Sequence, residues 1–197
     1  MKKNCLLLVL AIIFSAYAHA QVEAGIKLGA NLYNFLGEDS KPAIGDKNLK
    51  PGIVAGVFTD IRLAKLFSVQ PGLLYSEEGS IHKNGEDKIT YKMNYLNLPL
   101  MLKCNLPSGF FGEIGPQVGY LLSAKVTTEV GDITITNKMA DAKEVVFSGN
   151  IGCGWKFKNG LGINARSQWA FSNSIEKVKV RNNGFYASVF YQFKLQK

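Results

Sequence analysis

Apolar and polar residues alternate along most of this sequence. Over residues 95–103, Leu96, Leu98, Leu100 and Leu102 alternate with Asn97, Pro99, Met101 and Lys103. Residues 22–33 and 113–122 show the same period of two. Successive side chains of a β-strand point to opposite faces, so this pattern predicts strands with one apolar and one polar face.

Eight segments carry the pattern, and we expect each to form a strand. They cover residues 22–33, 53–63, 67–76, 95–103, 113–122, 145–157, 161–171 and 185–193. The polar connections at 35–50, 77–88, 123–143 and 172–183 are long, and the turns at 64–65, 105–109 and 158–160 are short. Residues 126–136, inside the third long connection, have the composition of a β-extension. Asn159-Gly160 is typical of a tight hairpin turn.

This order predicts an all-β fold, an eight-stranded antiparallel up-and-down transmembrane β-barrel. Outer-membrane barrels have short periplasmic turns and long external loops, and an even strand count places both termini in the periplasm. Aromatic residues also gather at the strand ends, which predicts two interfacial girdles. They are Phe67, Phe110, Trp155, Phe157, Tyr191 and Phe193 near the short turns, and Tyr75, Tyr120, Trp169, Phe171 and Phe185 near the long loops.

A soluble secreted binding barrel is the alternative fold. Its apolar face would point inward and its exterior would carry many charges. Here the polar face consists mainly of Gly, Ser, Asn and Gln with few charges. Small polar residues suit a crowded lumen better than a solvated exterior, so the membrane barrel is favoured.

The N-terminus resembles a secretory signal peptide. Lys2 and Lys3 precede the apolar run 6–18, and Ala18-His19-Ala20 supplies the small residues of a cleavage site. We therefore expect a signal peptide at residues 1–20 and an outer-membrane barrel domain at residues 21–197. No later apolar run reaches the 18 or so residues that a spanning helix needs.

The charge of the chain argues against nucleic-acid binding. The whole sequence carries a net charge of +8, and loss of Lys2 and Lys3 would lower it to +6. The basic residues are spread along the chain and form no block. The expected partners are outer-membrane lipid and, through the external loops, an envelope or surface protein, and we expect a monomer.

The sequence shows no catalytic, metal or cofactor site. After cleavage the one remaining histidine is His82, which we interpret as a solvated residue of an external loop and not as a general base. The acidic pairs Glu77-Glu78 and Glu38-Asp39 are interpreted as solvated loop charges, because no His/Cys cluster accompanies them. The expectation is a protein that is not an enzyme.

Charged residues on the inward faces form the candidate site. They are Glu23, Lys27, Asp60, Arg62, Lys103, Glu113, Lys156 and Arg166. The interior of an eight-stranded barrel is just wide enough for side chains to fill it, so an ionic plug is favoured over a narrow ion path. Cys104 and Cys153 are expected to be free thiols, because one strand separates them and a disulfide needs closely spaced backbones.

Three motifs resemble a known family. Residues 95–103 (Tyr-Leu-Asn-Leu-Pro-Leu-Met-Leu-Lys), 115–124 (Gly-Pro-Gln-Val-Gly-Tyr-Leu-Leu-Ser-Ala) and 160–166 (Gly-Leu-Gly-Ile-Asn-Ala-Arg) are similar to the PorT-like outer-membrane β-barrel family of Bacteroidetes, often labelled porin-like. The resemblance extends over the mature chain and implies the barrel fold. The expected function is a non-enzymatic barrel with a filled lumen that is structural or binds a partner or ligand through its loops. The alternatives are a small porin-like channel and the soluble secreted barrel.

Overall fold

The alternating segments fold into antiparallel β-strands. The computed structural model describes residues 22–37, 46–139, 141–175 and 179–194, so the predicted signal peptide 1–20 and the pair Glu38-Asp39 lie outside the described residues. The strands are β1 (Val22–Leu36), β2 (Asp46–Asn48), β3 (Lys50–Arg62), β4 (Phe67–Asn84), β5 (Asp87–Asn105), β6 (Phe110–Val130), β7 (Ile133–Lys138), β8 (Val145–Lys156), β9 (Leu161–Ala170) and β10 (Arg181–Lys194). No helix among the described residues is long and apolar enough to cross a membrane.

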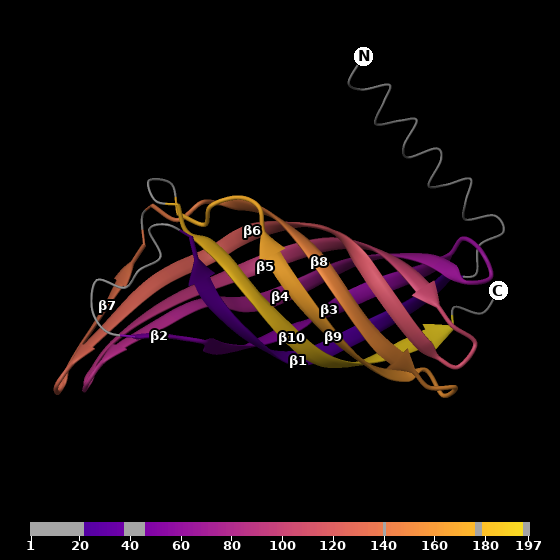
Figure 1. Cartoon of the computed structure of the whole chain (residues 1–197), viewed down its shortest axis with the longest axis horizontal. Coiled ribbons are helices and arrows are strands. Elements are labelled where there is room, and N and C mark those ends of the chain that lie inside the picture. The colour runs from indigo at the N-terminus through magenta and orange to yellow at the C-terminus, as the bar shows by residue number, and fades with distance from the viewer. Residues whose placement is uncertain (1–21, 38–45, 140, 176–178, 195–197) are drawn as a thin grey trace, which may run out of the picture.

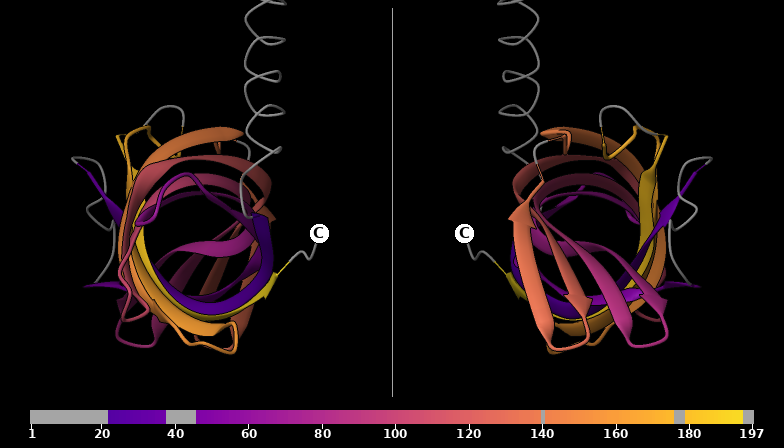
Figure 2. Two further views of the ribbon diagram at one scale, coloured as in Figure 1. Left: turned by 90° about the vertical axis from the view of Figure 1, so that its right-hand side faces the viewer. Right: turned by 90° about the vertical axis from the view of Figure 1, so that its left-hand side faces the viewer.

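Eight of these strands close into a barrel (Figure 1). Their order around the ring is β1-β3-β4-β5-β6-β8-β9-β10, and β10 pairs with β1 to complete it. Figure 2 shows the ring from both ends. The predicted up-and-down barrel is confirmed, because each strand pairs with its neighbours in antiparallel orientation.

Three strands of the ring, β4, β5 and β6, continue beyond it at the end with the long connections, where β2 pairs with β4 and β7 pairs with β6 (Figure 1). We call this region the extension. It comprises β2, β7 and the parts of β4, β5 and β6 that lie past the barrel, within residues 77–94 and 123–130. The expectation of a loop over residues 77–88 is wrong, because β4 and β5 pair as far as Asn84 and Asp87. Gly85, at a φ of 60°, makes the tight turn between them. Most residues of these strand ends are polar, so the sequence shows no clear period of two there.

The outward faces define the membrane-spanning parts. On β4 the outward side chains are apolar over Phe67–Tyr75 and change to Glu77, and on β6 they are apolar over Phe110–Leu122 and change to Lys125. We take such apolar stretches as the spanning segments and the residues beyond them as the extension. The predicted girdle aromatics are exposed on this outer face, except Tyr75, which is partly buried.

Both cysteines lie on the outer face as free thiols, as predicted. Gly112 on β6 lies between them in register, opposite Cys104 of β5 on one side and Cys153 of β8 on the other. The two thiols are therefore separated by two strand spacings, which is too far for a disulfide.

Candidate functional site

An ion pair between Arg166 on β9 and Glu113 on β6 lies in the middle of the lumen. Both side chains are almost completely buried. Arg166 donates through Nη2 to Glu113 Oε2 at 2.9 Å and through Nε to Oε1, and Asn164 Nδ2 donates to the same Oε1 at 2.9 Å. These residues face inward because they occupy the polar positions of the alternating pattern.

A second buried ion pair lies beside the first. Lys103 Nζ is 2.9 Å from Asp60 Oδ2. Gln70 joins the two pairs, since its Nε2 donates to Asp60 Oδ2 at 3.2 Å and its Oε1 accepts from Arg166 Nη2 at 3.1 Å. Sequence reasoning missed Gln70 because it considered only charged residues; its inward position between Val69 and Pro71 was the available signal.

Three residues of the predicted set of inward-facing charges lie outside these two buried ion pairs. Glu23 and Lys156 form a partly exposed ion pair of 2.8 Å at the barrel end with the short turns. Lys27 is buried, and its Nζ lies 5.4 Å from the centre of the Phe58 ring. No salt bridge to Lys27 is found among the described residues.

The expectation for Arg62 is wrong. Arg62 faces inward by parity, but it is the last residue of β3 and is exposed at the rim. A side chain at a strand end reaches water, so Arg62 does not join the buried ion pairs.

An aromatic floor closes the half of the lumen near the short turns. We use this name for Phe58, Phe111 and Phe190, whose rings meet edge to face at 5.8 Å (Phe58–Phe190) and 6.0 Å (Phe111–Phe190) between centroids. Each ring covers an inward-facing glycine directly opposite on the next strand. The pairs are Phe58–Gly25, Phe111–Gly154 and Phe190–Gly162. The glycines provide the space in which the three rings fit.

Amide groups fill the lumen above the ion pairs. Tyr33 Oη donates to Gln168 Oε1 at 2.8 Å, Gln117 Nε2 donates to the same oxygen at 2.9 Å, and Asn150 Nδ2 donates to Gln117 Oε1 at 3.2 Å. The four residues come from β1, β6, β8 and β9, so the layer crosses the barrel from wall to wall.

Glu78 is buried where the barrel passes into the extension, so its interpretation as a solvated loop charge is wrong. Its carboxylate accepts hydrogen bonds from Asn97 Nδ2 at 3.0 Å and Asn182 Nδ2 at 2.8 Å. Burial raises the pKa of Glu78 from 4.5 to about 7, and the hydrogen bonds around it offset only part of this effect. Glu78 can therefore change its charge near neutral pH.

The interpretation of His82 as a solvated residue of an external loop is also wrong. It lies buried in β4, and its ring contacts the Tyr91 ring at a tilt of 59°, with ring centroids 5.3 Å apart. An apolar cap closes the lumen below it, formed by Phe35, Met93, Tyr95, Ala124, Val146 and Val180. Apolar groups thus pack against the polar interior toward both ends of the barrel.

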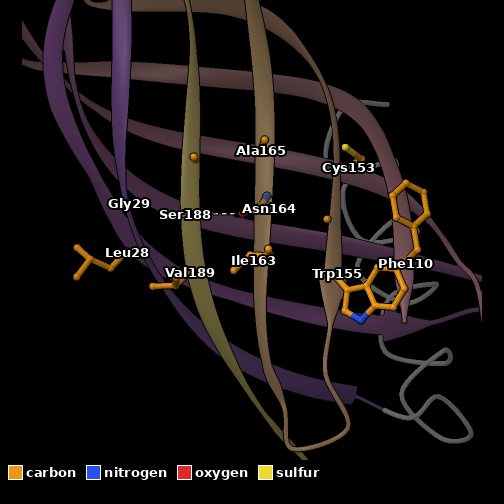
Figure 3. Close-up of a pocket in the computed structure, with 12 residues that line it drawn as sticks. Leu28, Gly29, Phe110, Cys153, Trp155, Ile163, Asn164, Ala165, Ser188 and Val189 are labelled. Atoms are coloured by element: carbon orange, nitrogen blue, oxygen red, sulfur yellow. Dashed lines mark hydrogen bonds between the residues drawn. The ribbon is translucent and has the colours of Figure 1, made fainter. Parts of the chain in front are cut away.

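A hollow of about 680 Å³ lies on the outer wall over β1, β8, β9 and β10 (Figure 3). Its base is made by small residues that are cross-strand neighbours, Cys153, Ala165 and Ala187. Larger side chains such as Trp155 and Ile163 flank it. The hollow faces away from the ion pairs, so it belongs to the apolar wall and not to the lumen.

No group of three or more potential metal-ligating side chains occurs within the described ranges. The buried carboxylates of Glu113 and Asp60 are each occupied by a cationic side chain. These two carboxylates are therefore engaged by side chains of the protein itself.

Comparison with known proteins gives a family and a number of structural neighbours, including the following two. A family model described as outer membrane protein beta-barrel domain matches residues 15–176. Neisserial surface protein A is 10% identical with a TM-score of 0.57, covering 86% of this chain and 97% of its own. Ail, the attachment invasion locus protein of Yersinia pestis, is 11% identical with a TM-score of 0.52, covering 88% of this chain and 99% of its own. None of the curated proteins matches the sequence.

Proposed function

The chain belongs to the outer membrane protein beta-barrel domain family, and we propose that it is a non-enzymatic barrel with a closed lumen that binds a protein partner through the extension. The observation that carries this proposal is the lumen, which the ion pairs, the amides and the aromatic floor fill, with the apolar cap toward the extension. A solute would have to break these contacts to pass. The closed lumen therefore favours a scaffold over a small pore.

The extension supplies the binding surface in this proposal. Its hairpins project well beyond the ring of strands (Figure 1), and a barrel needs such hairpins neither for closure nor for spanning. Strand β7 pairs with β6 on one side, and no strand among the described residues pairs with its other edge. An unpaired edge can accept an extended strand from a partner through backbone hydrogen bonds.

The proposed orientation places the extension outside the cell. The short turns and both described chain ends lie together at the other end of the barrel (Figure 1), as expected for a periplasmic side. A signal peptide over residues 1–20 would direct export to this location. We also assign the chain to the PorT-like group, on the motifs at 95–103, 115–124 and 160–166.

Conductance in planar bilayers tests the closed lumen. We expect the parent protein to give no steady conductance, and Arg166→Ala to open a measurable current because it removes the bulky guanidinium from the centre. Arg62→Ala is the matched control, since Arg62 lies exposed at the rim. A parent that conducts steadily, with variants changed only in ion selectivity, would assign the chain to the pore class instead.

Site-specific photo-crosslinking in intact cells tests the binding surface. A crosslinker at Thr134 on β7 should capture one defined protein, and the same group at Lys158, in the opposite turn, should not. Replacing Ile135 by proline removes a backbone donor from β7 and should reduce capture. Equal capture from Thr134 and Lys158 would contradict a role for the β7 edge.

A further inference from the structure

Three lysines lie side by side on the outer face of the extension. Lys92 of β5 is directly opposite Lys125 of β6, which is directly opposite Lys138 of β7. Their neighbours Met93 and Ala124 point into the apolar cap, so the lysine side chains point the other way, outward. We call Lys92, Lys125 and Lys138 the lysine row.

The lysine row carries more positive charge than the surrounding carboxylates neutralise. Lys92 Nζ forms a salt bridge of 3.0 Å with Glu77. Neither Lys125 nor Lys138 forms a salt bridge with any of the described residues, although they face each other across neighbouring strands. Like charges in directly opposite positions destabilise a sheet, so this pair would be stabilised by an anion from outside the chain.

The height of the lysine row identifies where that anion lies. Leu122 is the last outward apolar residue of β6, and Lys125 follows three positions later. At about 3.3 Å per residue and a tilt of about 40°, Lys125 is roughly 7–8 Å beyond the apolar band along the membrane normal. The polar headgroup layer of a bilayer occupies about this depth beyond the hydrocarbon.

We propose that Lys125 and Lys138, assisted by Lys92, bind the phosphate group of an anionic lipid in the outer leaflet. The apolar wall, including Leu122 and Leu96, begins just below the lysine row, past Asn94 and Ser123, and in this proposal it contacts the acyl chains of the same lipid. Flexible ammonium groups suit a phosphate as point charges. The bound lipid fixes the base of the extension against the membrane surface.

Lipid retention tests the proposal. The full barrel is reconstituted in nanodiscs of phosphatidylcholine, alone or with a minor fraction of bisphosphorylated lipid A, and the retained lipids are counted by native mass spectrometry. The parent should retain lipid A in preference to phosphatidylcholine. Lys125→Gln with Lys138→Gln should weaken this retention about tenfold to thirtyfold.

Lys83→Gln is the matched control. Lys83 lies on the same extension opposite Lys88, near the hairpin tip and beyond the reach of the headgroups. Its loss should change lipid A retention less than about twofold, given the distance dependence of surface electrostatics. If Lys83→Gln weakens retention as much as the double variant, general charge and not the lysine row binds the lipid, and the proposal fails.

A charge reversal at Lys125 gives an independent test, because its effect on the thermal midpoint should differ without and with lipid A. Lys125→Glu places a carboxylate opposite Lys138, so the thermal midpoint in phosphatidylcholine alone should rise above that of the parent. Lipid A should raise the midpoint of the parent and leave that of Lys125→Glu unchanged or lower. A parent midpoint that does not respond to lipid A, or responds equally to free inorganic phosphate, would overturn the assignment to a lipid headgroup.

Discussion

Arg166 and Glu113 form a two-pronged ion pair across the lumen, between strands that are not neighbours in the barrel. The pair therefore bridges over β8, and the bond from Arg166 to Gln70 of β4 reaches the opposite side of the ring, where Gln70 contacts Asp60, the partner of Lys103. An arrangement of this kind is sensitive to loss of one member, because the remaining charge stays buried without its partner.

Removing one member of this pair should strongly destabilise the barrel. Arg166→Ala or Glu113→Ala should lower the free energy of unfolding by about 3–5 kcal/mol, measured by urea titration in lipid vesicles. Arg62→Ala should change it by no more than about 0.5 kcal/mol, because that side chain is exposed. The double variant Arg166→Met with Glu113→Leu should cost less than either single change. Equal stability of Arg166→Ala and Arg62→Ala would refute the buried plug.

The aromatic floor gives a second prediction, based on its glycines. In Gly162→Ala the new Cβ would overlap the Phe190 ring, so the floor must shift. We expect a loss of about 1–3 kcal/mol in unfolding free energy, which Phe190→Leu in the same chain should partly restore. Gly112→Ala is the control, because no atom lies within 4 Å of the position that its Cβ would take. Identical losses for the two alanine variants would show that the cost comes from the glycine backbone and not from ring packing.

The period of two in the sequence predicted most of the barrel, because in the spanning segments only one face contacts lipid. The inward or outward direction of Leu98, Glu113 and Arg166 follows from that rule alone. The same rule failed for Glu78 and His82, since residues 77–84 of β4 are mostly polar on both faces and show no clear alternation.

Contacts across the lumen could not be predicted from the sequence. They depend on register, and the register between β5 and β6 shifts at Asn94 and Tyr95, where an irregularity reverses the parity of β6. The pairing of each floor phenylalanine with a glycine likewise depends on which residues stand opposite. For Arg62 the inward direction was predicted correctly, but the burial was not, because Arg62 is the last residue of β3 and its side chain reaches water.

The outer face provides a third prediction. Val57→Arg or Val118→Arg places a charge in the apolar band and should cost about 2–4 kcal/mol near the midplane, measured by unfolding in vesicles. Ile135→Arg is the matched control, since Ile135 is equally apolar and exposed but lies on β7 in the extension. It should fold into vesicles as well as the parent. Equal costs at Val57 and Ile135 would contradict the assigned position of the band.

Glu78 predicts a pH dependence of stability. Its pKa is about 7 in the folded protein against 4.5 for an ordinary glutamate, so between these values the folded state holds a proton that the unfolded chain has released. Stability therefore falls as pH rises through this window, and the difference corresponds to about 3 kcal/mol. The unfolding free energy of the parent should decrease from pH 5 to pH 8, whereas that of Glu78→Gln, which cannot ionise, should lack this component.

Glu77→Gln separates this effect from other titrations. Glu77 precedes Glu78 but points outward, and although its slight burial acts to raise its pKa, the bond from Lys92 lowers it overall. A group with a lowered pKa loses its stabilising contribution as pH falls, which is the opposite sign. The Glu77→Gln variant should consequently retain the decline between pH 5 and pH 8. If the unfolding free energy of Glu78→Gln falls as steeply as that of Glu77→Gln between pH 5 and pH 8, the buried carboxylate is not the group that titrates.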